Sequence, residues 1–308
     1  MYKDEWKQRE QSCEKSFMEN GPFWFICADH RDRVLFKSET DFKEAVNATA
    51  IAAARNGVKV YGDVYMSNHA HWIVGSCSRE QAQTFYDDWT RHLAKWDSLV
   101  NGFTDLRNWP GKIYEVPDLK AFRSMFAYLA RNPYVAISDA TPFGYRWGSA
   151  DLFFNDNVRD YDLGVPYSSL SIRGKRLICR SKNIDLPERY RVRDGRILKL
   201  SYIEMPGTQS LFNSGNQYFN MLARNAETNL EIARMIGEKI TLPDDEVFGI
   251  ACSISQAEFK SPLKTLDVPR RLELARILHF EYGSNNRQIS QILRLPVDEI
   301  NRVFPIPQ

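Results

Sequence analysis

The sequence predicts an α+β fold in which a ferredoxin-like domain is followed by an all-helical domain with a helix-turn-helix. The first observation is the order strand-helix-strand-strand-helix-strand-helix between residues 22 and 157, which is the split β-α-β pattern with one extra helix. The second is a cluster of basic residues within 158–209. The third is that almost every segment of 210–308 has helical periodicity.

The elements of the first domain are bounded by capping and turn residues. Residues 23–28 form an aromatic, apolar run typical of a buried strand. A helix over 38–57 begins at Ser38 or Thr40 and ends at Gly57. The next elements are strands at 58–66 and 69–76 around a Ser67-Asn68 turn, a helix at 78–101, a strand at 112–117 and a helix at 118–132. We expect the last helix to end before Pro133 because a residue preceding proline disfavours the helical conformation.

Composition limits the class of protein. The 308 residues include 41 basic and 39 acidic side chains, a net charge of +2 that still allows local basic patches. The five cysteines are odd in number and widely spaced, which argues against a disulfide framework or a cysteine-rich zinc site and favours a cytoplasmic protein. The polar start of the chain is not typical of a signal peptide, and no apolar run is long enough to predict a membrane span.

The regions outside the first domain have distinct patterns. Residues 1–21 are a polar lead-in. Residues 158–209 form a basic bridge in which 170–199 holds ten basic and three acidic residues, with a hairpin predicted to turn at Asp194-Gly195. The bridge can be a solvated linker or a segment that contacts phosphates, and the sequence favours neither.

The C-terminal region, 210–308, contains one long amphipathic stretch at 217–239 and three shorter helical segments at 270–283, 286–295 and 297–304. The last two are separated by a tight turn and preceded by a supporting helix, as in a helix-turn-helix. Short helical pairs of this kind also occur in ordinary bundles.

The most distinctive local motif is Asn68-His69-Ala70-His71-Trp72. In a strand, His69 and His71 point to the same face, about 7 Å apart, and can converge on one metal ion. Packing or surface placement of the two histidines is an equally good interpretation of so short a motif.

A second motif lies near the end of the helix predicted over 118–132. Tyr128 and Asn132 are four positions apart and therefore share one face. A helical tyrosine is usually a core residue, but tyrosine is also a nucleophile that forms covalent intermediates. The Asn132 carbonyl oxygen could join two imidazoles in a mixed site that leaves positions open for phosphate oxygens.

Three segments together carry a resemblance to a known family: MSNHAHWIV (66–74), YLARNPYVA (128–136) and YRWGS (145–149). Their order and spacing resemble the HUH superfamily of single-strand DNA endonucleases, and most closely its REP-associated tyrosine transposases. The resemblance covers residues 22–155, about half of the chain. Ser67, Ala70 and Gly148 depart from the family pattern without removing a proposed site residue.

The resemblance implies a function for each motif residue. His69, His71 and Asn132 would hold Mg²⁺ or Mn²⁺, and Tyr128 would attack a phosphodiester in single-stranded DNA. The products would be a 5′-phosphotyrosine link and a free 3′-hydroxyl. The implied partners are single-stranded DNA and DNA hairpins, with no membrane partner. The oligomeric state is not predicted.

Binding of single-stranded DNA requires aromatic stacking surfaces and cations. The candidates are Trp109, Tyr145, Trp147, Arg31, Arg33, Lys112 and Arg146. Two other functions stay open. One is a DNA-binding regulator that keeps the fold without strand cleavage. The other is an RNA-binding or metal-storage module in which His69 and His71 hold a structural ion.

Overall fold

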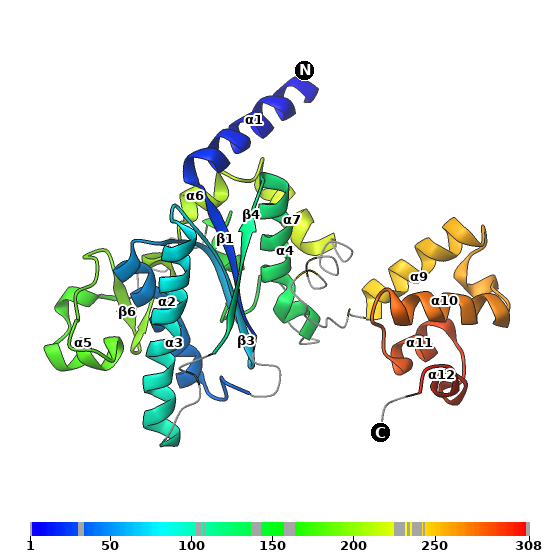
Figure 1. The fold of residues 1–308 in the computed structure, drawn as a ribbon. Coiled ribbons are helices and arrows are strands. Elements are labelled where there is room, and N and C mark those ends of the chain that lie inside the picture. The colour runs from blue at the N-terminus through cyan, green and yellow to red at the C-terminus, as the bar shows by residue number, and fades with distance from the viewer. Residues whose placement is uncertain are drawn as a thin grey trace. The chain divides into compact units, whose positions relative to one another are not determined.

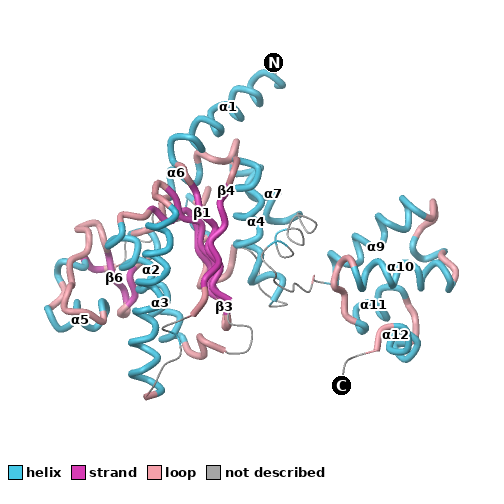
Figure 2. The backbone as a smooth tube through the Cα atoms, in the orientation of Figure 1, coloured by secondary structure: helices cyan, strands magenta, loops and turns pink. Residues whose placement is uncertain are grey.

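The computed structural model describes residues 2–29, 34–102, 106, 109–136, 143–156, 164–224, 232, 235, 242 and 244–305. The chain divides into two compact units (Figures 1 and 2). Unit 1 comprises Met1–Pro133 and Thr141–Arg224, and unit 2 comprises Tyr134–Ala140 and Asn225–Gln308. Helices and antiparallel sheets occur together, which confirms the α+β class.

The centre of unit 1 is a four-stranded antiparallel sheet. Its strands are β1 (Phe23–Asp29), β2 (Lys59–Tyr65), β3 (His69–Gly75) and β4 (Gly111–Val116), in the spatial order β2-β3-β1-β4. With the intervening helices, the chain order is β-α-β-β-α-β, the split arrangement predicted from the sequence. Strand β3, which carries both histidines, is therefore an inner strand.

Two helices cover one face of this sheet: α2 (Glu39–Asn56) and α3 (Arg79–Asn101) (Figure 1). Each begins with a capping box, at Ser38 and at Ser78, in which the serine side chain accepts a hydrogen bond from the third helical residue. Trp72 of β3 packs edge-on against Trp89 of α3 with ring centroids 4.5 Å apart. The apolar residues that alternate with the histidines therefore form the core on this side.

The opposite face is covered by α4 (Leu119–Ala136), and α7 (Gly215–Arg224) packs against α4. Phe122 of α4 packs against Phe23 of β1, and Nη1 of Arg131 donates to the Leu222 carbonyl at 3.0 Å. The prediction that α4 ends before Pro133 is wrong, because the helix continues to Ala136. Pro133 cannot donate a backbone hydrogen bond within the helix, and its apolar ring is buried.

The polar lead-in is a helix, α1 (Tyr2–Asn20), that packs on unit 1. Cys13 and Phe17 on this helix are buried. The Arg123 guanidinium on α4 forms an ion pair with Glu10 at 2.7 Å. A few buried contacts hold α1, which explains why its sequence has no clear apolar face.

The basic bridge folds around a small three-stranded sheet. Its strands are β5 (Val165–Pro166), β6 (Arg191–Arg193) and β7 (Arg196–Ile197). The predicted turn is confirmed, since Asp194 and Gly195 both have positive φ. The helices of this region are α5 (Ile172–Cys179) and α6 (Met205–Gln209), and single 3-10 turns occupy Tyr167–Ser169 and Lys199–Ser201. A further 3-10 turn, Ala150–Leu152, precedes the bridge.

The bridge is attached to unit 1 by specific hydrogen bonds. Nδ2 of Asn47, in α2, donates to the Gly195 carbonyl at 2.9 Å, and the Ile197 amide donates to Oδ1 of Asn47 at 2.8 Å. The basic region is therefore a docked part of the first unit.

Unit 2 is helical in its described part. Its helices are α9 (Asp244–Glu258), α10 (Val268–Phe280), α11 (Asn286–Leu293) and α12 (Val297–Val303), with one 3-10 turn at Leu263–Thr265. They enclose an apolar cluster that includes Leu274, Leu278, Ile289 and Ile300. The three short helices predicted near the C-terminus are thus present.

Of the helix predicted over 217–239, α7 gives the first part, and most of the remainder lies outside the described residues. Among the described residues, none of the helices combines the length and the apolar content needed to cross a bilayer.

Candidate functional site

The two histidines lie side by side on the sheet face that α4 covers. Their ring centroids are 5.1 Å apart. His71 pairs with Cys27 of β1, which pairs in turn with Lys112 of β4. Paired residues project to the same face, so His71, Cys27 and Lys112 form one row across three strands.

His71 lies within an aromatic cluster. Its side chain is fully buried. The imidazole stacks on Phe25 with ring centroids 5.6 Å apart and meets the Tyr128 ring edge-on at 5.5 Å. The strand motif and the helix motif identified in the sequence are therefore in contact, although they belong to different elements.

Asn132 lies one helical turn after Tyr128, and its amide has a defined orientation. Nδ2 of Asn132 donates to the Tyr128 carbonyl at 3.2 Å, which leaves Oδ1 directed at the sheet. This oxygen lies 2.9 Å from Nε2 of His69. The structure thus brings His69, His71, Tyr128 and Asn132 into one site.

The His69 imidazole lies between two amide oxygens. Nδ1 is 2.8 Å from Oδ1 of Asn68, and Nε2 faces Oδ1 of Asn132. A neutral imidazole carries one hydrogen, so it can donate to only one of these oxygens. Donation from Nδ1 to Asn68 leaves a lone pair on Nε2 that faces the lone pairs of Asn132. The other tautomer places the hydrogen on Nε2 and donates it to Oδ1 of Asn132, whereas with the hydrogen on Nδ1 a cation shared by Nε2 and Oδ1 satisfies both atoms.

The donor set fits a small divalent cation. Two neighbouring ligands of an octahedral site with bonds of about 2.1 Å lie roughly 3.0 Å apart. The separation of Nε2 of His69 and Oδ1 of Asn132 is 2.9 Å. In the described part of the chain, no group of three or more His, Cys, Asp or Glu side chains is arranged to hold a metal ion, so the third protein ligand at this site would be the amide oxygen.

Tyr128 is almost completely buried, with 1% of its surface exposed. Its ring packs against Phe25 at 6.1 Å and against His71. A phosphate can therefore reach the Tyr128 hydroxyl only after a covering group moves away.

Two of the proposed stacking residues are unsuited to that function. Trp109 and Trp147 are buried, and Trp147 stacks on Phe42 with ring centroids 5.0 Å apart. The Tyr145 hydroxyl donates to the Tyr65 carbonyl at 2.8 Å. These aromatic side chains are therefore used in packing, which the sequence alone does not distinguish from stacking on bases.

The proposed cations have different environments. Lys112 and Arg146 are exposed, and Arg146 forms an ion pair with Glu39 at 2.9 Å. Arg31 and Arg33 lie outside the described residues. Lys112 is the cation that lies in the same cross-strand row as His71.

Two polar residues of the sheet region have no specific function predicted from the sequence. Asn68 is the first residue of the histidine motif, and its side chain contacts Nδ1 of His69. Asp63 lies on the other sheet face, where Oδ2 accepts from the hydroxyls of Tyr65 at 2.9 Å and Tyr202 at 2.7 Å. Burial raises the pKa of the Asp63 carboxyl.

No protein-family model matches the chain, and no curated protein gives a significant match. Among solved structures, the chain is similar to one described as the REP-associated tyrosine transposase bound to a REP hairpin. The two share 12% sequence identity with a TM-score of 0.34, and the alignment covers 42% of this chain and 77% of that one.

Proposed function

We propose that the chain is a metal-dependent endonuclease and strand transferase, of the transposase type, that cleaves single-stranded DNA next to short hairpins. The observation that carries the proposal is the approach of His69 and Asn132 to 2.9 Å, with Tyr128 one turn before Asn132. These residues are the ones in the motifs that resemble the HUH transposases.

His69, His71 and Asn132 would hold Mg²⁺ or Mn²⁺. The bound ion would polarise the target phosphodiester and neutralise charge that develops on it. Asn68 Oδ1, 2.8 Å from Nδ1 of His69, would accept the Nδ1 hydrogen and so hold the tautomer whose Nε2 lone pair faces the ion.

Tyr128 supplies the nucleophile. Its hydroxyl oxygen attacks the phosphorus, the bond from phosphorus to the 3′-oxygen breaks, and a 5′-phosphotyrosine link forms. The phenol proton is lost to solvent, and the departing 3′-oxygen takes up a proton to give a hydroxyl. One phosphate ester replaces another, so the step needs no nucleotide cofactor and can be reversed by a 3′-hydroxyl.

A second candidate function is a hairpin-binding regulator that does not cleave DNA. The burial of Tyr128 favours it, because a hydroxyl with 1% of its residue surface exposed is poorly placed to meet a phosphate. The two functions differ in one product, the covalent adduct between protein and DNA.

The last helix of unit 2, α12, has an acidic first turn. A recognition helix presents its N-terminal residues to the major groove. The first turn of α12 instead carries Asp298 and Glu299, both exposed, which repel phosphates. The charge of this first turn therefore does not favour binding of α12 in a DNA groove.

Single-stranded hairpins labelled at the 5′ or the 3′ end test the proposal. With Mn²⁺, we expect a protein band that gains the mass of the 3′-side fragment and survives denaturation. The band should be absent with a chelator and in Tyr128→Phe. Hairpin binding without an adduct in the unmodified protein would contradict the nuclease and favour the regulator.

A further inference from the structure

A basic groove lies between α3 and α5 in unit 1. Its volume is about 1090 Å³. One side is a single face of α3 that includes Arg91, Lys95 and Ser98. The other side consists of Arg176 and Arg180 from the bridge. A smaller, adjoining hollow of about 630 Å³ extends the groove to Lys182.

The groove concentrates positive charge. Arg91, Lys95, Arg176 and Arg180 line it together with one acid, Asp87. Arg91 is paired with Asp88, and Arg180 with Glu44 at 2.5 Å. Arg176 and Lys182 are exposed, at a surface where anions can reach them.

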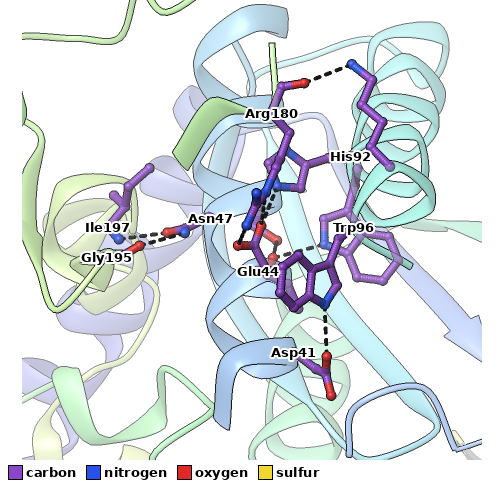
Figure 3. A network of polar contacts seen from close by, with 12 residues as sticks. Asp41, Glu44, Asn47, His92, Trp96, Arg180, Gly195 and Ile197 are labelled. Atoms are coloured by element: carbon purple, nitrogen blue, oxygen red, sulfur yellow. Dashed lines mark hydrogen bonds and ion pairs between the residues drawn. The ribbon is translucent and has the colours of Figure 1, made fainter. Parts of the chain in front are cut away.

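The wall formed by α5 is held in place by a buried ion network, shown in Figure 3. Glu44 accepts from Arg180 and lies 3.0 Å from Nε2 of His92. The Arg180 guanidinium also lies over the Trp96 ring, 4.7 Å from its centroid. Burial lowers the pKa of His92, and the neighbouring Glu44 carboxylate opposes this shift.

A lysine on α3 completes this attachment. Nζ of Lys95 donates to the Arg180 carbonyl at 3.2 Å, which joins α3 to the end of α5 and keeps an ammonium group in the groove. The groove is thus formed by elements that are fixed to each other before any ligand binds, which lowers the entropic cost of binding.

The groove is separate from the histidine site. It lies beyond α3, which packs on the Trp72 face of the sheet, whereas His71 faces α4. The described residues that line it include no aromatic side chain. Binding of single strands depends on aromatic stacking, whereas binding of a duplex backbone depends on cations that neutralise phosphates.

We infer that this groove binds the phosphate backbone of double-helical nucleic acid, with Arg176 and Lys182 as the accessible contacts. Arginine and lysine at such positions bind phosphate oxygens through charge-assisted hydrogen bonds. The inference does not depend on strand cleavage by Tyr128. A chain that cleaves beside hairpins would use the groove for a duplex stem.

Binding of a blunt 20-base-pair DNA duplex to the full-length chain, measured by fluorescence anisotropy at several salt concentrations in the presence of a chelator, tests the inference. In Arg176→Ala/Lys182→Ala, the slope of log affinity against log salt should fall by about 2. The dissociation constant should rise about tenfold near physiological salt.

The matched control is Lys7→Ala/Arg9→Ala, which removes the same charge from exposed positions of α1. Equal effects of the two double variants, or no effect of the groove variant, would overturn the inference. The milder pair Arg176→Gln/Lys182→Gln gives the same comparison if the alanine variant does not fold.

An acidic protein segment is the alternative polyanion that the groove could bind. A glutamate-rich peptide of the same total charge as the duplex tests this alternative. If the peptide displaces the duplex at equal charge concentration, the groove is a site for acidic protein segments and the inference is wrong. The chelator prevents cleavage in these measurements. Failure of the nuclease proposal and failure of this inference are therefore observed in separate assays.

Discussion

Nε2 of His69 lies 2.9 Å from Oδ1 of Asn132, although 63 positions separate the two residues in the chain. The contact joins the inner strand β3 to α4 at the point where the helix carries Tyr128. The Asn132 amide is oriented by the Tyr128 carbonyl, so the candidate nucleophile and the candidate ligand are positioned by the same turn of helix.

Asn68→Ala should weaken Mn²⁺ binding by roughly 10- to 100-fold, the usual effect of removing a residue that orients a ligating imidazole. The physical reason is the loss of the acceptor 2.8 Å from Nδ1 of His69, after which the hydrogen can move to Nε2. Isothermal titration calorimetry with Mn²⁺ measures this effect. Ser67→Ala, at the exposed neighbouring position, is the control and should bind Mn²⁺ normally.

Helix boundaries in the first unit were predictable because their signals are local. The helix expected over 38–57 is observed as Glu39–Asn56, with Ser38 as N-cap and Gly57 in the left-handed conformation. The continuation of α4 past Pro133 was missed because the sequence rule does not include burial of the proline ring. Helix α1 was missed because its stability depends on tertiary contacts such as Glu10 with Arg123.

The sequence was enough to predict which residues form the candidate site, but not which neighbouring aromatic side chains are buried. Alternation along β3 placed both histidines on one face, and the i, i+4 spacing placed Tyr128 beside Asn132. Burial of Trp147 against Phe42 depends on two segments meeting in the fold, so no local pattern distinguishes it from an exposed stacking residue.

The buried Asp63 predicts a pH dependence of stability. Burial raises its pKa above the usual value of 3.8, so the folded state holds the proton more tightly than the unfolded state does. Between these two pKa values the folded state binds more protons, and the free energy of unfolding therefore falls as the pH rises through this window.

Asp63→Asn should remove this component, because an amide does not ionise and its oxygen can still accept from Tyr65 and Tyr202. The variant should therefore become more stable relative to the unmodified protein as the pH rises from about 4. The difference between their free energies of unfolding should change by about 1.4 kcal/mol for each pH unit inside the window. Urea denaturation at pH 4.5, 6 and 8 measures it. A difference between the two proteins that is constant with pH would refute this assignment.

Glu44→Gln should destabilise unit 1 by about 3 kcal/mol, because it leaves the partly buried Arg180 guanidinium without its counter-ion. Chemical denaturation at pH 7 gives this value. The control is Glu39→Gln at an exposed ion pair with Arg146, which should leave stability unchanged within error. Equal stability of both variants would mean that the network in Figure 3 does not hold α5 in place.

The central claim, that Tyr128 forms the covalent link to DNA, is tested most directly by peptide mapping. The chain is incubated with a hairpin substrate and Mn²⁺, the DNA is trimmed with nuclease, and the protein is digested with trypsin. Cleavage after Arg123 and Arg131 releases residues 124–131, in which Tyr128 is the only tyrosine. Mass spectrometry should find the nucleotide mass on this peptide. A nucleotide on 113–120, which contains Tyr114, or on 132–146, which contains Tyr134 and Tyr145, would contradict the account.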